Sequence, residues 1–248
     1  MDPTAEPMIT VKRHGITSRF DMSPWPQDAP PTLYKPFFTN QFYEQKFLDY
    51  IRTLNKRGVY VDAGSCLGTH TVWFGMYCPS THVHAFDPRE RCAGWTQMNV
   101  DVNDLTSKVT VHHVGLGSEP GQAKSFLDGV WEHFDVVPLD KVVRGKVVVL
   151  KIDVEGMEEQ VLKGARRILR GHHPIVFAEA FGEPERATIE AALKPYGYRP
   201  TGRVFNATPT YEFVYERSRP KELLYSVGRK LPKPLRKRLV KLRDKLRG

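Results

Sequence analysis

The hydrophobic positions of the chain form short apolar runs, separated by longer stretches in which apolar residues recur every three or four positions. The runs predict strands and the spaced stretches predict helices, in alternation. The clearest run, Lys146–Ile152, is apolar at almost every position, which is typical of a parallel strand covered on both faces. We expect strands over residues 58–61, 81–86, 109–114, 146–152 and 174–178.

Helices are expected between these strands, over residues 69–78, 88–100, 158–169 and 185–193, with a further one from Phe42 to Leu54. Two last strands, 198–205 and 211–217, flank the turn Asn206–Pro209 and predict an antiparallel hairpin. The whole pattern predicts an α/β fold. We expect a doubly wound sheet of seven strands with an antiparallel C-terminal hairpin strand.

Composition divides the chain into three parts. Residues 1–40 are rich in proline and show little periodicity, so we expect an irregular arm or lid there. Residues 41–216 carry the predicted strands and helices of one domain, for which the length is sufficient. Residues 217–248 form a tail with 13 Lys and Arg against two acids, which leaves 24 basic and 26 acidic residues in 1–216. This near-neutral body argues against a basic nucleic-acid groove.

The end of the tail has its leucines on one helical face and basic residues around the rest. The leucines are Leu235, Leu239, Leu242 and Leu246. Such a helix resembles those that lie on anionic membranes, so we expect residues 231–248 to contact such a surface. The alternatives are a helix that packs on the body and a disordered basic end.

Other features bear on the compartment. No run approaches the roughly 20 apolar residues of a membrane span, and residues 1–31 lack the apolar core of a secretory signal. The three cysteines form no C-x-x-C pair, and the histidine pairs lack metal-ligand spacing. We therefore expect a cytoplasmic protein without a metal, with peripheral attachment to the inner membrane face through the tail.

A glycine-rich turn follows the predicted strand at 58–61. Gly64 and Gly68 let the backbone approach a ligand closely, and Asp87 ends the next strand, where a ribose-binding acid is expected. Asp62 stands where a dinucleotide fingerprint has glycine, and its carboxylate would repel a pyrophosphate. It suits S-adenosylmethionine, which carries an ammonium and a sulfonium group. The turn therefore predicts a methyl donor as cofactor.

Acidic residues also follow the predicted strand at 146–152. Asp153 lies at the strand's end, where an acceptor hydroxyl and the donor methyl group would meet, and Glu155 lies two residues on. A carboxylate there can orient the hydroxyl or accept its proton. The alternative is a helix start at which Glu155 and Glu158 favour the N-terminal dipole. We assign the catalytic role to Asp153 and Glu155.

Two more residues are candidate acceptor contacts. Glu179 ends the fifth strand and could touch substrate, with a solvated loop acid as the alternative. Tyr43 precedes the first strand and could fold over the cofactor or acceptor. His70 follows the glycine-rich turn, near a helix start, where we expect a structural histidine. Cys66 lies inside the turn and is expected to act as a small spacer.

Several stretches match one family pattern. Val61–Gly68 resembles the D-x-G-A-N-x-G loop of this pattern, and Ala85–Pro88 resembles its A-F-E-P strand end. Asn99–Asn103 resembles its N-x-x-x-N helix segment, and Leu139–Asp140 resembles its L-D pair. Lys151–Ala165 resembles its K-I-D-V-E-G-x-E…V-L-x-G-A signature. On these residues, the stretch from about 43 to 179 resembles the FkbM family of S-adenosylmethionine-dependent methyltransferases. Ser65 and Cys66 depart from the alanine and asparagine of the loop, Asp87 replaces the usual glutamate, and the basic tail is not part of the pattern.

The resemblance implies a class I methyltransferase (Rossmann-like) sheet and O-methylation of a hydroxyl on a sugar, glycan or small metabolite. A lipid-linked sugar would be reachable from a membrane surface. Asp87 would bind the donor's ribose and the Gly115–Leu116 turn would lie beside its adenine. The amino-acid part of the donor would be held by Asp62, Gly64, Ser65 and Gly68.

Two other functions stay open at this stage. One is a nucleic-acid methyltransferase recruited by the basic tail, although the N/D-P-P-Y/F strand end typical of base-amine methylation is absent and nucleic acid is not the expected partner. The other is a non-catalytic binding module that keeps the fold.

Overall fold

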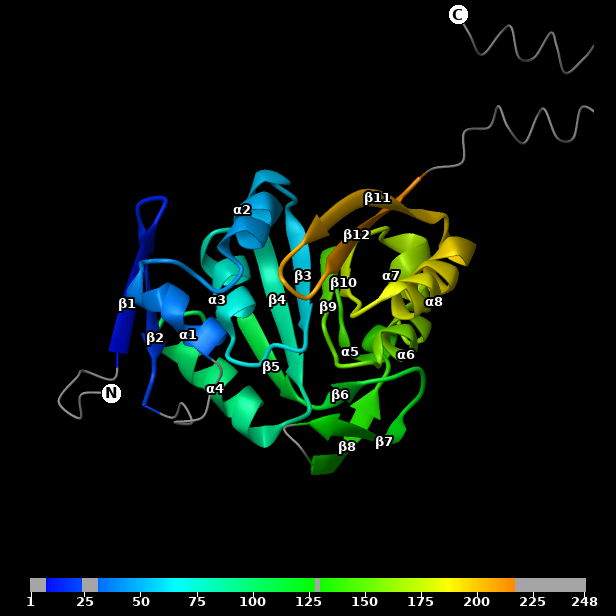
Figure 1. The fold of residues 1–248 in the computed structure, drawn as a ribbon, viewed down its shortest axis with the longest axis horizontal. Helices are drawn as coiled ribbons and strands as arrows, with labels where there is room; N and C mark the ends of the chain where they lie inside the picture. Colours follow the sequence, from blue (N-terminus) through cyan, green and yellow to red (C-terminus); the bar gives the residue numbers. More distant parts are fainter. Residues whose placement is uncertain (1–7, 24–30, 128–129, 217–248) are drawn as a thin grey trace, which may run out of the picture.

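The computed structural model describes residues 8–23, 31–127 and 130–216, and the predicted tail helix lies outside these ranges. A seven-stranded sheet forms the centre of the molecule (Figure 1), in the order β11-β12-β10-β9-β3-β4-β5. Its strands are β3 (Gly58–Ala63), β4 (Ser80–Asp87), β5 (Val109–His113), β9 (Val147–Ile152), β10 (Ile175–Glu179), β11 (Tyr198–Phe205) and β12 (Thr210–Tyr215).

The pairing of the strands confirms the predicted doubly wound sheet. β3 pairs in parallel with β4 and with β9. β4 likewise pairs in parallel with β5, and β9 with β10. β12 is antiparallel to both of its neighbours, β10 and β11. The carboxyl ends of the parallel strands therefore meet at one edge, where ligands bind in open α/β sheets.

Helices cover both faces of the sheet, as its near-continuous apolar strands require. Along β3, Tyr60 belongs to one hydrophobic cluster and Val59 and Val61 to the other, because successive side chains point to opposite faces. The first cluster packs under α2 (Gln45–Thr53), α3 (Thr69–Met76) and α4 (Glu90–Asp101). The second packs under α5 (Leu139–Val142), α6 (Glu158–Lys163), α7 (Arg166–Gly171) and α8 (Glu183–Leu193), which a 3₁₀ turn, Lys194–Tyr196, follows.

The helix predicted over residues 158–169 is instead two helices, α6 and α7, separated at Gly164. A Cβ on Gly164 would lie 2.1 Å from the carbonyl oxygen of Gly117, so the backbones touch there. The carboxylate of Asp140 accepts hydrogen bonds from the amides of Arg167 and Ile168, at 2.6 and 3.1 Å. Asp140 thus caps the start of α7 from a distant segment and makes the second helix start stable.

The expectation of an irregular arm is wrong for much of residues 1–40. β1 (Met8–Arg13) and β2 (Ile16–Asp21) form a hairpin, and α1 (Pro31–Phe38) follows. His14 and Gly15 both have positive φ, which is typical of a two-residue hairpin turn. Val11 and Phe20 are buried in the first hydrophobic cluster. The hairpin is therefore part of the main core.

Two asparagines fix the hairpin to α4. Asn103 accepts a hydrogen bond from the amide of Arg19 and donates to its carbonyl, at 2.8 and 2.6 Å. Asn99 accepts from the amide of Asp21 at 3.0 Å and donates to the carbonyl of Leu67 at 2.8 Å. The side chains of Asn99 and Asn103 therefore hydrogen bond to the backbone of β2 as a neighbouring strand would. Asn99 also joins β2 to the glycine-rich turn.

A second, small sheet was not predicted. It has the order β6-β8-β7 and lies below the main sheet in Figure 1. Its strands are β6 (Gly115–Leu116), β7 (Gly121–Leu127) and β8 (Val130–Val137). The Gly115–Leu116 turn is thus a short strand paired with β8.

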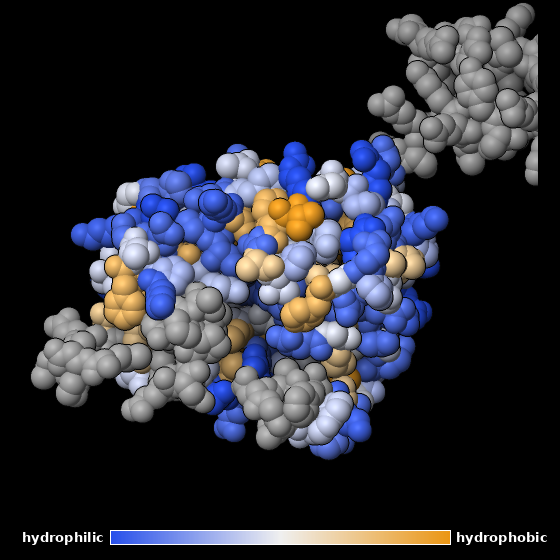
Figure 2. Space-filling view, in the orientation of Figure 1, coloured by the Kyte–Doolittle hydropathy of each residue, from blue (hydrophilic) through white to orange (hydrophobic). Residues whose placement is uncertain are grey.

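Among the residues that the structure describes, no helix has both the length and the apolar character needed to cross a bilayer. On the face shown in Figure 2, hydrophobic residues form small groups between larger polar areas.

Candidate active site

The charged residues of the site project from one edge and one face of the sheet. Asp62 and Lys151 lie opposite each other in the register of β3 and β9. Asp153 follows the end of β9, and Glu179 is the last residue of β10. They lie two positions beyond the paired residues Lys151 and Phe177, so they are on this same face, and Asp87 ends β4. The predicted strand-end acids are therefore brought together.

Gly64 holds the first turn of the site in place. Its φ is +82°, and a Cβ would lie 1.7 Å from the carbonyl oxygen of Asp153, so any side chain would displace the backbone. The amides of Gly64 and Ser65 both donate to the carbonyl of Phe86, at 2.9 and 3.0 Å. Gly68, with φ +74°, precedes α3 and packs on Thr96. Residues 64–68 form the donor loop.

Lys151 is the central cation of the site, and the sequence pattern did not single it out. Its buried Nζ donates to the carbonyl of Gly64 at 2.7 Å and lies 3.1 Å from Asp62 Oδ1 and 3.4 Å from Asp153 Oδ2. Burial opposes the charge, but the attraction of Asp62 and then Asp153 outweighs burial and raises the pKa of Lys151. Lys151 therefore stays charged and joins the donor loop to both carboxylates.

Asp62 lies behind the donor loop. Its side chain is fully buried, and its Oδ2 accepts a hydrogen bond of 2.6 Å from Thr71. It lines neither of the two cavities described next. A direct contact of Asp62 with the donor stays a prediction, and the described contacts give it the role of holding Lys151.

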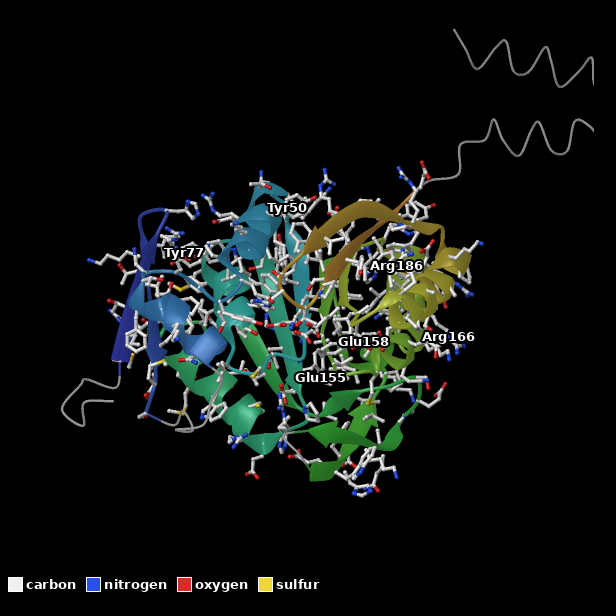
Figure 3. The ribbon with its side chains drawn as sticks, viewed as in Figure 1. Tyr50, Tyr77, Glu155, Glu158, Arg166 and Arg186 are labelled. Atoms are coloured by element: carbon white, nitrogen blue, oxygen red, sulfur yellow. The ribbon has the colours of Figure 1, made fainter. Side chains whose placement is uncertain are left out.

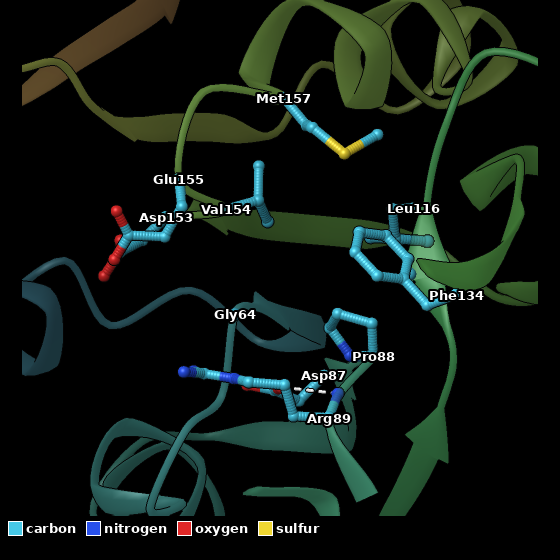
Figure 4. A pocket seen from close by; sticks show the side chains of 11 residues that line it. Gly64, Asp87, Pro88, Arg89, Leu116, Phe134, Asp153, Val154, Glu155 and Met157 are labelled. Carbon is cyan, nitrogen blue, oxygen red and sulfur yellow. Dashed lines mark hydrogen bonds and ion pairs between the residues drawn. The ribbon is translucent and has the colours of Figure 1, made fainter. Parts of the chain in front are cut away.

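Two neighbouring cavities open at the carboxyl edge and share Gly64 and Asp153 as a common border. The first, of about 420 Å³, is lined by residues of the β4 end, β6, β8 and the loop after β9 (Figure 4): Gly64, Asp87, Pro88, Arg89, Gly115, Leu116, Phe134, Asp153, Val154, Glu155 and Met157. The second, of about 350 Å³, is lined by Tyr43, Gly64, Ser65, Cys66, Leu67, Thr69, His70, Lys151 and Asp153.

The first cavity has a polar and an apolar end. In Figure 4, Asp153 and Glu155 lie on one side of it and Asp87 and Arg89 on the other, with Phe134 near Leu116 at one end. Gly115 packs against the Phe134 ring, which a Cβ would approach to 2.8 Å. Phe134 had no signal in the sequence, because it reaches the cavity only through the unpredicted strand β8.

Asp87 is almost fully buried and is held in place by three hydrogen bonds. Its Oδ2 accepts from the amide of Cys66 at 2.9 Å, and its Oδ1 accepts from Arg89, from the amide at 3.0 Å and from Nε at 3.3 Å. A carboxylate so fixed keeps its position at the wall of the first cavity, which it lines.

The second cavity is bordered by Tyr43 and His70, whose rings are stacked with centroids 6.1 Å apart. His70 Nε2 lies 3.2 Å from Glu44 Oε2, and both side chains are largely buried. Burial, and then the charge of Glu44, raise the pKa of Tyr43, so its hydroxyl stays protonated. His70 thus lies at the cavity wall, beyond the structural role expected for it.

The loop after β9 is shaped by Glu158. Its Oε1 accepts hydrogen bonds from the amides of Val154 and Gly156, at 3.2 and 3.1 Å. Glu155 between them has a φ of +53°, a conformation that such a residue rarely adopts. Glu155 and Glu158 lie close together near the centre of Figure 3. Glu158 is therefore a structural residue that orients Glu155 toward the first cavity.

Cys66 is more than a spacer. Its φ of +47° lies in the left-handed region that asparagine tolerates well, which accounts for the asparagine of the family pattern. An interaction with the thiol of Cys92 on α4 lowers the pKa of the Cys66 thiol. In the described part of the chain, no group of three or more His, Cys, Asp or Glu is arranged to hold a metal ion.

Comparison with known proteins agrees with this geometry. The model of the methyltransferase FkbM domain matches residues 62–200, which is more than half of the chain. An FkbM methyltransferase from Methylobacillus flagellatus KT is 22% identical, with a TM-score of 0.54 over 64% of this chain and 44% of that chain. A proposed rRNA methylase from Clostridium thermocellum is 16% identical, with a TM-score of 0.51 over 70% of this chain and 94% of that one. No curated protein matches the sequence.

The sheet order, the glycine-rich turn and the strand-end acids define a class I, S-adenosylmethionine-dependent methyltransferase with a Rossmann-like fold. Within that class, the chain belongs to the FkbM methyltransferase family. The matched stretch of the Methylobacillus protein is less than half of its length, so the likeness to that structure concerns the fold.

The residues of the first cavity suit S-adenosylmethionine, the cofactor of this family. The Gly64 backbone approaches where no Cβ fits, Asp87 lines the cavity as a fixed carboxylate, and Leu116 with Phe134 gives the cavity an apolar end. Asp87, Gly115 and Leu116 line this cavity, and their contacts with the ribose and adenine of the donor stay predictions. Ser65 lines the second cavity, while Gly68 and Glu179 line neither cavity.

Replacing Asp87 with alanine is expected to weaken S-adenosylmethionine binding by at least about 1 kcal/mol, or roughly fivefold, because a charged hydrogen bond to the ribose is lost. Calorimetric titration measures this. Asp101→Ala, a change of an exposed carboxylate at the end of α4, should leave the affinity as it is. Equal affinities of Asp87→Ala and the unmodified protein would remove the ribose assignment.

Proposed function

We propose that this methyltransferase transfers the methyl group of S-adenosylmethionine to a hydroxyl of a sugar, glycan or other small metabolite. The observation that carries this proposal is the position of Asp153. Its carboxylate borders both cavities and is paired with the buried cation Lys151. A hydroxyl in the second cavity would therefore meet an ionised carboxylate next to the donor site.

The pairing gives Asp153 the chemistry of a hydroxyl-binding group. Burial alone would raise its pKa, but the Lys151 charge and then a hydrogen bond from Glu179 outweigh burial and lower it. Asp153 is thus ionised at neutral pH, and can accept a hydrogen bond and then a proton from a hydroxyl. The bound donor supplies an electrophilic methyl group. Most of the rate would come from alignment of the two reactants.

The charges near the second cavity favour a neutral acceptor. The ionised Asp153 borders it and Glu44 lies beside its wall residue His70, while the buried cation Lys151 is shared with Asp62. A phosphate-rich strand would be repelled by these carboxylates. We therefore rank a sugar or metabolite hydroxyl above nucleic acid.

Exposed apolar side chains flank the carboxyl edge. Phe181 lies two residues beyond Glu179 and is 63% exposed, and Val204 near the end of β11 is 53% exposed. β11 runs parallel to β10, because both are antiparallel to β12, so the two side chains lie at the same edge of the sheet. An acceptor with an apolar portion, such as a lipid-linked sugar, would find contacts there.

The test is methyl transfer from isotope-labelled S-adenosylmethionine to a panel of hydroxylated glycosides and matching amines. We expect label in a hydroxyl and a loss of roughly 100-fold in kcat for Asp153→Asn, because the proton acceptor is removed. Glu190→Gln, an acid-to-amide change on α8, serves as control. Label on amines alone, or full activity of Asp153→Asn, would contradict the proposal.

A further inference from the structure

Asp153 and Glu179 lie side by side at the edge of the sheet. β9 and β10 pair in parallel with Ile152 beside Ala178, so the next residues on the two strands are Asp153 and Glu179. Their side chains lie on the same face of these adjacent strands, each carboxyl group shifts the pKa of the other, and Glu179 is only 9% exposed. Two carboxyl groups can hydrogen bond only when one of them holds a proton.

Lys151 decides which carboxyl keeps the proton. Its Nζ lies 3.4 Å from Asp153 Oδ2 and stabilises the negative charge of that residue. Burial, then the charge of Asp153, raise the pKa of Glu179 to about 9, while that of Asp153 is lowered. The pair thus contains an ionised Asp153 and a protonated Glu179 across the neutral range.

The groups around the pair reinforce this division. Glu155, on the loop after β9, adds negative charge that further opposes ionisation of Glu179. Tyr43 and Glu44 approach from before α2, and His70 from α3. Glu155 and Glu44 are acidic and Lys151 is already shared with Asp62, so a second negative charge on the pair is unfavourable.

We propose that Glu179 is a positioning residue that shares one proton with Asp153, and so directs the free lone pairs of the Asp153 carboxylate at the acceptor hydroxyl. This inference rests on the proposed function, since it supposes a hydroxyl acceptor. Glu179 donates its O–H to one Asp153 oxygen. The other lone pairs of Asp153 then face the cavity that it lines, while Glu179 lines neither cavity.

The proton balance of the transfer follows from this arrangement. The acceptor oxygen forms the bond to the methyl carbon, the carbon–sulfur bond breaks with its electron pair left on sulfur, and the hydroxyl proton passes to Asp153. Asp153 and Glu179 then hold one proton each, and the pair has lost its negative charge. One proton leaves to solvent before the next turnover, which restores ionised Asp153 beside protonated Glu179.

The test compares Glu179→Gln with Glu179→Ala, because glutamine keeps a hydrogen-bond donor at this position and alanine does not. At pH 7 we expect kcat to fall by about threefold in Glu179→Gln and by at least roughly 30-fold in Glu179→Ala, the loss of a hydrogen bond to a charged group. In the unmodified enzyme kcat should decline as pH rises through about 9, where Glu179 ionises. Glu179→Gln should lack this decline.

Thermal unfolding gives a second measurement that needs no acceptor. Between the ordinary glutamate pKa and about 9, the folded protein binds one proton more than the unfolded chain at Glu179, so stability falls as pH rises. The melting temperature of Glu179→Gln should therefore exceed that of the unmodified protein by a margin that grows from pH 5 to pH 9. Glu190→Gln should show no such growth.

The outcomes separate the two proposals. A growing difference in melting temperature, without methylation of any hydroxyl, would support the shared proton and overturn the proposed reaction. Parallel melting curves and parallel pH–rate profiles for Glu179→Gln and the unmodified enzyme would overturn the shared proton. Equal activity losses in Glu179→Gln and Glu179→Ala would also overturn it.

Discussion

Replacing Gly64 with alanine is expected to abolish measurable binding of S-adenosylmethionine. The new Cβ would lie 1.7 Å from the carbonyl oxygen of Asp153, and a φ of +82° adds a strain of about 1 kcal/mol for any residue but glycine. The donor loop must then move away from the end of β9. That movement breaks the hydrogen bond from Lys151 to the Gly64 carbonyl and opens the border of both cavities.

Calorimetric titration with S-adenosylmethionine and S-adenosylhomocysteine measures this loss, with NAD as a ligand that should not bind. Gly94→Ala is the matched control, because Gly94 lies in α4 with open space around its Cβ position. That change should leave binding intact and add about 0.5–1 kcal/mol of stability. Donor affinity of Gly64→Ala within twofold of the unmodified protein would show that the loop does not form the donor site.

Replacing Lys151 with methionine is expected to lower the free energy of unfolding by about 3–5 kcal/mol, the usual cost of removing one partner from a buried ion pair. Asp62 is fully buried and would keep a negative charge without its cation, beside Asp153. The stem of methionine has nearly the volume of the lysine stem. The loss therefore reports charge more than packing.

Urea unfolding of Lys151→Met, of Asp62→Asn and of the double variant measures this effect. The second change removes the unpaired charge, so the double variant should regain part of the lost stability. Stability of the double variant equal to the sum of the two single losses would show that Asp62 and Lys151 act independently. Such additivity would contradict the network described around Lys151.

The main sheet could be predicted because its strands are buried on both faces and are therefore apolar almost throughout. The break between α6 and α7 could not, since it depends on hydrogen bonds that the carboxylate of Asp140 accepts from the amides of Arg167, 27 residues later in the chain, and of Ile168. The hairpin before residue 22 escaped prediction because its strands are short and the prolines nearby suggested irregular structure. His14-Gly15 was the available signal for its turn.

The strand-end acids of the site were predicted from position alone, because parallel strands deliver their ends to one edge. The role of Lys151 was not, since a lysine at the end of an apolar run resembles an exposed strand end. Only the register of β3 against β9 shows that it faces Asp62 inside the core. Likewise, the contact of Asp153 with Glu179 depends on β10 lying next to β9, which the sequence order does not state.

The antiparallel direction of β12 also fixes where the basic tail begins. β12 starts at Thr210, beside Glu179, and runs away from the carboxyl edge to Tyr215. The described residues therefore end, at position 216, at the edge opposite the active site. The 32 residues of the tail can span at most roughly 110 Å. The sequence predicts that this tail binds a membrane. If it does, the tail would act as a tether, and the opening of the active site could reach acceptors at different distances from the bilayer.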